Sequence, residues 1–295
     1  MRSIHLAFAA VSTLIALGPA RAEEPIIHPL CVQQLAGMVD FHFVNQIDAP
    51  LPAAECNRGF STIPVDIQGD VASAEIPGSA EAQPPFYDYR IAGRHEGVAV
   101  LDVAESTGGT GIFSALVFVE GWPDGDLVSE DVRLRQVGVL EGGDRCNGGI
   151  AEAMVEGSTL RLGERLTPFD LFLFRPTRAV RKDRARGFYE AIENPGADVV
   201  SPKLMALEPY EDLDTAAASC IGAATTEFDL DTGTARLVSI TVTGLIDEDP
   251  DWVAKYRHQA CFNRVVKDTV RVFPRTLTPI QVRAMSEVFE TECLR

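Results

Sequence analysis

Six cysteines constrain the fold of this chain more than any other feature of its sequence. No two of them form the close C-x-x-C pair that structural zinc sites favour, since the nearest two, Cys31 and Cys56, stand 25 positions apart. An even number of cysteines in an exported chain predicts disulfides rather than free thiols. We therefore expect three disulfides among Cys31, Cys56, Cys146, Cys220, Cys261 and Cys293.

The N-terminus predicts export. Arg2 supplies a positive charge, residues 4–17 are largely apolar, and small residues occupy positions −3 and −1 of a cleavage site after Ala22. The apolar run is shorter than the roughly 20 residues that a membrane span needs. We therefore expect residues 1–22 to be a signal peptide. The mature chain is then expected to be a periplasmic or secreted protein without a membrane span.

The composition is that of a folded, acidic protein. Hydrophobic residues make up 46% of the chain and charged residues 23%, and 43 acidic residues face 26 basic ones for a formal net charge of −17. Phosphate backbones require a basic face, so this charge argues against a nucleic-acid partner. It also argues against broad adsorption to anionic lipid.

Strand patterns dominate the middle of the chain. Short alternating or fully apolar segments separated by glycine-rich turns run from residue 86 to about 166. Two of them, 98–103 and 112–119, are apolar on both faces, which predicts central buried strands. The fold class expected is α+β, with a mainly antiparallel meander that forms a barrel or a sandwich. We expect a single domain over residues 23–295.

Helix signals flank these strands. Thr167-Pro168-Phe169-Asp170 is a helix-start signature that opens an insertion at about 167–205. The C-terminal part, about 250–295, predicts two antiparallel helices joined by five residues, and the second opens with a capping box at Thr278 and Gln281. The expected helices are 27–37, one starting at 168, 177–193, 250–273 and 279–293.

Local geometry helps to predict two of the three cysteine pairs. In the C-terminal helical hairpin, Cys261 and Cys293 lie 15 and 17 positions from the midpoint of the turn, so their thiols can meet. A faint repeat places Cys146 and Cys220 at equivalent starts of two similar hairpins, and these thiols can meet if the hairpins are neighbours. The predicted disulfides are Cys31–Cys56, Cys146–Cys220 and Cys261–Cys293.

One basic segment departs from the acidic composition. Six Lys and Arg residues occur between positions 175 and 186, and on a helix Arg178, Arg181 and Arg186 lie near one face. Such a face could bind an acidic protein or an anionic ligand. The alternative is a solvated helix face, or a patch that answers the chain's own acids.

No catalytic signature occurs in the sequence. The nucleophile elbow, the S-x-x-K and H-E-x-x-H motifs and the P-loop are all missing. Four histidines follow the predicted cleavage site, and we expect each to be structural. The stretch Asp229-Leu-Asp231-Thr-Gly233 resembles a miniature cation-binding loop, but this pattern more often forms a hairpin turn. We predict no cofactor and no metal.

Three functional hypotheses follow. The first is a non-enzymatic binding or accessory protein of the bacterial cell envelope, because export and disulfides coincide with the lack of catalytic motifs. The second is a periplasmic hydrolase whose site is built from scattered acids and His95 or His258. The third is a carrier that holds a small apolar ligand inside a β-barrel.

Overall fold

The computed structural model describes most of the chain after the predicted signal peptide. The predicted cleavage site after Ala22 and Arg186 lie outside the described residues, and of 178–183 and 188–193 only the backbone is described. None of the described helices is long and apolar enough to cross a membrane. The described residues are 26–39, 42–43, 50–77, 84–124, 128–173, 178–183, 188–193, 201–216, 218–243, 250–273 and 275–295.

A seven-stranded antiparallel sheet forms the first half of the fold. Its strand order is β3-β9-β8-β7-β6-β5-β4. The two apolar segments expected to be central lie at its middle, in β7 and β8, where most side chains are buried. The strands are β3 (Leu51–Pro52), β4 (Asp66–Gln68), β5 (Val71–Glu75), β6 (Phe86–His95), β7 (Val98–Ser106), β8 (Phe113–Glu120) and β9 (Arg133–Asp144).

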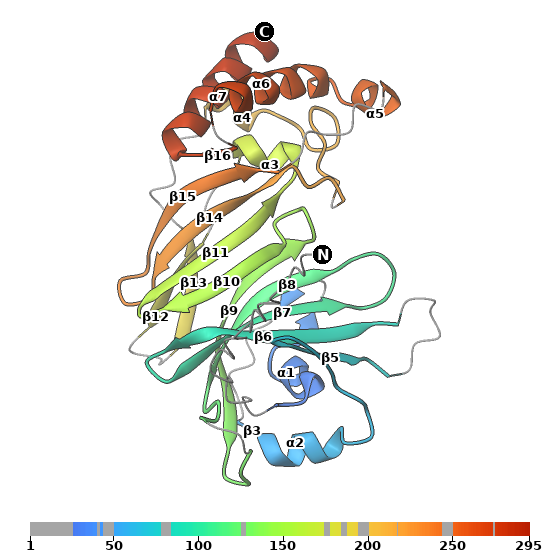
Figure 1. Cartoon of the computed structure of the whole chain (residues 1–295), viewed down its shortest axis with the longest axis vertical. Coiled ribbons are helices and arrows are strands. Elements are labelled where there is room, and N and C mark those ends of the chain that lie inside the picture. The colour runs from blue at the N-terminus through green and yellow to red at the C-terminus, as the bar shows by residue number, and fades with distance from the viewer. Residues whose placement is uncertain are drawn as a thin grey trace, which may run out of the picture.

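The concave face of this sheet is filled by helix α1 (Pro29–Leu35). The sheet curls around α1 (Figure 1), and Leu30, Val32 and Leu35 pack against buried side chains such as Leu101 and Val117. His28 caps α1, because its Nδ1 accepts a hydrogen bond of 3.2 Å from the Leu30 N–H. Helix α2 (Ala53–Gly59) follows β3, and the Cys31–Cys56 disulfide joins it to α1.

A second antiparallel sheet contributes side chains from one of its faces to two separate hydrophobic cores. Its order is β10-β11-β14-β15-β16. Leu160 and Leu162 in β11 pack against the first sheet, and Leu166, which shares their face, packs under the C-terminal helices. The second sheet therefore packs against both the first sheet and the C-terminal helices. Its strands are β10 (Ile150–Glu156), β11 (Thr159–Leu166), β14 (Gly222–Asp229), β15 (Thr234–Val242) and β16 (Thr276–Leu277).

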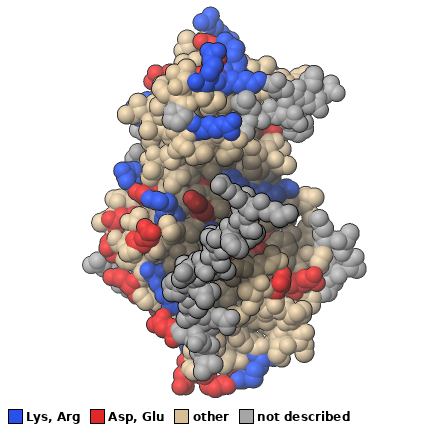
Figure 2. Space-filling view, viewed as in Figure 1, with Lys and Arg blue, Asp and Glu red and all other residues tan. Residues whose placement is uncertain are grey.

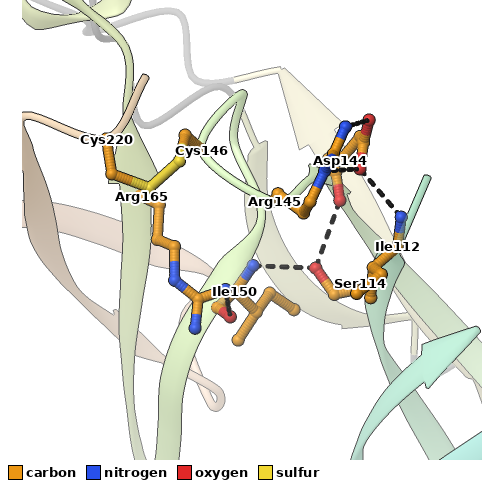
Figure 3. A network of polar contacts seen from close by, with 9 residues as sticks. Ile112, Ser114, Asp144, Arg145, Cys146, Ile150, Arg165 and Cys220 are labelled. Atoms are coloured by element: carbon orange, nitrogen blue, oxygen red, sulfur yellow. Dashed lines mark hydrogen bonds and ion pairs between the residues drawn. A yellow bond between two sulfur atoms is a disulfide. The ribbon is translucent and has the colours of Figure 1, made fainter. Parts of the chain in front are cut away.

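The glycine-rich joint between the sheets is locked by a polar network. The buried Ser114 hydroxyl accepts a hydrogen bond of 2.7 Å from Ile150 N–H and donates one of 3.3 Å to Gly143 O (Figure 3). Asp144 accepts from Ile112 N–H at 2.9 Å. The Cys146–Cys220 disulfide then ties the joint to the start of β14, and β11 pairs with β14, so the two repeated hairpins are neighbours as expected. The glycine-rich segment 142–149 is thus structural.

The C-terminal helices form the predicted hairpin over the end of the second sheet (Figure 1). The capping box is confirmed, because Thr278 Oγ1 accepts from Gln281 N–H and Gln281 Oε1 accepts from Thr278 N–H. Cys261 and Cys293 form the expected disulfide, with their Cα atoms 5.8 Å apart. The helices after β11 are α3 (Pro168–Leu173), α4 (Pro202–Met205), α5 (Pro250–Lys255), α6 (Gln259–Val272) and α7 (Pro279–Cys293).

The helix expected over 250–273 is divided into α5 and α6. The N–H groups of Arg257 and His258 donate to the carbonyls of Glu211 and Asp212 instead of to the preceding helical turn. These long-range hydrogen bonds end α5 and start α6 at Gln259. The expectation of one continuous helix was therefore wrong. A local sequence pattern cannot reveal hydrogen-bond acceptors that lie more than 40 residues away in the chain.

The helix expected over 177–193 was also wrong. This segment forms an antiparallel hairpin of β12 (Arg178–Asp183) and β13 (Phe188–Glu193). Aromatic and β-branched residues in both halves favour strands, and a glycine at position 187 disfavours a continuous helix. A further short hairpin joins β1 (Met38–Val39) to β2 (His42–Phe43).

Candidate functional site

The turn end of the α6–α7 hairpin is the candidate functional site. The last turn of α6, the connection and the first turn of α7 meet there. Strand β16 lies within the connection and pairs with β15, so the turn end is fixed to the second sheet. Leu277 in β16 and Met285 in α7 are buried beneath it. A rigid scaffold thus presents the residues that point outward.

Three large apolar side chains are exposed at this end. Val272 is 70% exposed, Phe273 40% and Ile280 81%. Single exposed apolar residues are common on protein surfaces, but several in one place mark an interaction surface. Because the opposite faces of the same helices fill the core, these three side chains are not needed for packing. We call Val272, Phe273 and Ile280, with the arginines described next, the hairpin tip.

The hairpin tip is also a basic part of an acidic molecule. Residues 269–286 contain Arg271, Arg275 and Arg283 and no Asp or Glu, within a chain of formal charge −17. All three arginines are exposed. Figure 2 shows Lys and Arg over the C-terminal helical end with a few Asp and Glu among them, and charges of both signs over the sheets. Arg271 lies 3.4 Å from Asp268, just before this stretch. The tip therefore combines exposed apolar side chains with exposed arginines.

The basic segment predicted from the sequence lies elsewhere, on the β12–β13 hairpin. The strand register places Arg178 opposite Glu193 and Arg181 opposite Glu190. Opposite charges at paired positions stabilise a hairpin. The register therefore supports the interpretation that the basic residues of this segment pair with acidic residues of the same chain. The common face proposed for Arg178, Arg181 and Arg186 depended on a helical period, which the backbone does not have. Binding by these residues stays a prediction.

Each histidine named in the hydrolase hypothesis has an acid beside it. His258 Nε2 lies 3.4 Å from Asp212 Oδ1, and Arg257 Nε lies 3.0 Å from the same oxygen. Within the described part of the chain, no Ser, Thr or Cys side chain is hydrogen-bonded to His258. This cluster anchors the segment before β14 to α6, because Asp212 O also accepts from His258 N–H. His95 pairs with Asp231 on another part of the surface.

Two half-buried carboxyls lie on one face of β6 and β7. Burial raises the pKa of Asp88 to about 6, and the nearby Asp102 charge acts in the same direction. Burial also raises the pKa of Asp102, against the opposing effect of Arg90, which donates to Asp102 Oδ2 at 2.9 and 2.7 Å. Asp102 is therefore committed to Arg90. The two acids do not form the free acid–base pair that glycoside hydrolysis requires.

Comparison with protein-family models, with curated proteins and with solved structures finds no match for this chain. The hairpin tip was missed by the sequence analysis, although a signal existed. The stretch 269–286 carries arginines without acids, and its apolar residues exceed the stripe that a helix needs to cover a core.

Proposed function

We propose that this chain is an exported, non-enzymatic binding or accessory protein of the bacterial cell envelope, and that it binds an acidic protein through the hairpin tip. The observation that carries the proposal is the exposure of Val272, Phe273 and Ile280 inside an acid-free, arginine-bearing stretch. Aromatic and aliphatic anchors surrounded by charges are the usual composition of a transient protein interface.

Export is supported by the disulfides. Three disulfides use all six cysteines, and no described cysteine is free. Disulfides persist in oxidising compartments such as the periplasm. The sequence of residues 1–22 supports the same destination through its charged start, apolar run and small residues before the cleavage site.

The charge distribution favours a protein partner over a membrane. Stable attraction to anionic lipid takes about four to eight clustered basic residues, and the tip offers Arg271, Arg275 and Arg283 on a molecule of charge −17. The acidic body would be repelled by an anionic bilayer. A partner with an acidic rim and an apolar pocket complements both the charge and the exposed side chains of the tip.

The other two hypotheses find less support. The concave face of the first sheet is covered by α1 and its apolar side chains, where a carrier would hold its ligand. The acids beside His258 and His95 come from well-separated parts of the fold, and Arg257 occupies the carboxylate beside His258. Both arrangements suit structural or ion-binding roles better than hydrolysis.

Site-specific photo-crosslinking in the periplasm tests the proposal. A photoreactive residue at Ile280 or Phe273 should trap one discrete acidic protein, and the yield of this adduct should fall when crosslinking is done in high salt, because the arginines of the tip are charged. Ile67 in β4 is the matched control position, since it is 52% exposed and lies on the edge strand of the first sheet rather than in the C-terminal helices. An equal adduct pattern at all positions, or lipid adducts at the tip, would refute an acidic protein partner.

A further inference from the structure

A second feature of the surface lies where turns from both sheets meet. The end of β6 contributes His95 and the β6–β7 turn Glu96, the β14–β15 turn contributes Asp231, and the β10–β11 turn contributes Gly157. One ligand atom each from His95, Glu96 and Asp231 lies within 4.8 Å of the other two. The first two residues belong to one sheet and Asp231 to the other.

Hydrogen bonding fixes which nitrogen of His95 can bind a cation. Nδ1 lies 3.1 Å from the Gly157 carbonyl oxygen, which can only accept, so Nδ1 carries the proton. In the neutral imidazole the lone pair is then on Nε2. Metal-binding histidines are characteristically held in this way, with the second nitrogen donating to a backbone carbonyl.

The Nε2 atom is buried and points at the carboxylate. The His95 side chain is only 9% exposed, and within the described part of the chain Nε2 has no hydrogen-bond partner. It lies 3.2 Å from Asp231 Oδ1. Ligand atoms about 2.0 to 2.1 Å from a tetrahedral Zn²⁺ are about 3.3 Å apart, so this separation, which is also that of a His–Asp ion pair, fits two ligands on one ion.

The acidic side chains are held by turns of defined shape. Asp229 Oδ1 accepts from the N–H groups of Asp231 and Thr232 at 2.9 and 3.0 Å, which makes Asp229 a former of the turn rather than a ligand. Leu230 N–H donates to Ser158 O at 2.8 Å and so fastens this turn to the β10–β11 turn. In the Asp-x-Asp-x-Gly pattern noted in the sequence, Asp229 thus stabilises the turn, and Asp231 is left as the candidate ligand.

We propose that His95, Glu96 and Asp231 form a binding site for a divalent transition-metal cation of the Zn²⁺ type. Imidazole and carboxylate ligands suit Zn²⁺ better than Ca²⁺, which takes six to eight oxygens. Three protein ligands leave a position for water. The ion would also join the two sheets, so binding should stabilise the folded chain. This proposal differs from the prediction of no metal made from the sequence, and the titration below decides between the two.

Calorimetric titration of ZnCl₂ into the tag-free, chelator-treated, disulfide-intact chain tests the site. We expect one Zn²⁺ per chain, and a rise in Tm of about 5 °C at a hundredfold excess over Kd. Asp231→Asn keeps the shape of an exposed turn residue and should weaken binding at least tenfold, as should His95→Gln. His258→Gln is the matched control, because Arg257 repels a cation from that His–Asp pair. The affinity of this variant for Zn²⁺ should equal that of the wild-type chain.

Several outcomes would overturn the site. They are the absence of binding by the wild-type chain, unchanged affinity in Asp231→Asn, and equal loss in His258→Gln. Because His95→Gln can disturb a buried side chain, a second measurement reports on the wild-type protein directly. Imidazole ¹⁵N NMR should show the Nε2 resonance of His95 shifting on addition of Zn²⁺ while Nδ1 stays protonated. A shift in another histidine alone would contradict the assignment.

Discussion

Gly93 in β6 lies so close to Val155 in β10 that a Cβ atom at position 93 would stand 2.8 Å from both the Cβ and the carbonyl oxygen of Val155. The strand bulges at this point, and Gly93 has a φ of +147°, which L side chains rarely adopt. The backbone of the first sheet at Gly93 thus contacts Val155 of the second sheet directly, at a position where only glycine fits.

Replacing Gly93 by alanine should therefore destabilise the chain more than an ordinary glycine substitution. We expect a loss of about 2 to 4 kcal/mol in the free energy of unfolding, from overpacking together with backbone strain. Gly97→Ala is the matched control, because Gly97 has a φ of +80° but open space around it, and it should lose only about 1 to 2 kcal/mol. Urea unfolding measures both, and equal losses would contradict the close approach of the sheets.

The joint between the sheets depends on the Ser114 hydroxyl. Ser114→Ala leaves the Ile150 N–H without its 2.7 Å acceptor in a buried position. An unsatisfied buried donor costs about 1 to 3 kcal/mol, so we expect a loss of that size in chemical denaturation. The exposed Ser61, whose hydroxyl donates to Arg58 O, is the control, and Ser61→Ala should change stability by less than about 0.5 kcal/mol.

The raised pKa of Asp88 predicts a pH-dependent stability. Burial raises its pKa from 3.8 to about 6, so the folded chain binds this proton more tightly than the unfolded chain. Its favourable contribution is complete below about pH 4 and is lost as the pH rises through 6. Asp88→Asn should accordingly gain up to about 2 kcal/mol at pH 8 relative to wild type, after allowance for solvent screening, and nothing at pH 4. A gain that is the same at both pH values would contradict this origin.

The C-terminal disulfide should hold α7 in place. Replacing Cys261 and Cys293 together by alanine should lower the free energy of unfolding by about 3 to 4 kcal/mol in the chain-entropy model. Non-reducing peptide mapping of the wild-type chain should recover these two cysteines linked. Recovery of either one joined to Cys31, Cys56, Cys146 or Cys220 would refute the helical hairpin together with the disulfide.

Elements with a local cause were predictable from the sequence. The capping box at Thr278 and the apolar runs of β7 and β8 are encoded in neighbouring residues, and the Cys261–Cys293 disulfide follows from the length of the helices. Elements with a distant cause were not. The break between α5 and α6 comes from carbonyls at 211 and 212, and the β12–β13 hairpin forms in a segment that was expected to be a helix.

The two candidate sites were likewise predictable only where their residues are neighbours in the sequence. The Asp231 turn was visible as a pattern, but the histidine beside it comes from the end of a strand of the other sheet, 136 positions away in the chain. The hairpin tip was hidden because exposure cannot be read from residue type, and Val272 and Ile280 look like core residues until the fold shows which helix face is outside.

The central claim is that the hairpin tip, rather than the β12–β13 hairpin, binds an acidic protein, and one affinity measurement tests it. The partner trapped at Ile280 is titrated with wild-type chain and with two triple variants, Arg271→Ser/Arg275→Ser/Arg283→Ser and Arg178→Ser/Arg181→Ser/Arg186→Ser. We predict that the first variant binds at least tenfold more weakly with a flatter salt dependence, and that the second stays within about twofold of wild type. Loss of binding by the second variant with retention by the first would contradict the account and place the interface at Arg178, Arg181 and Arg186.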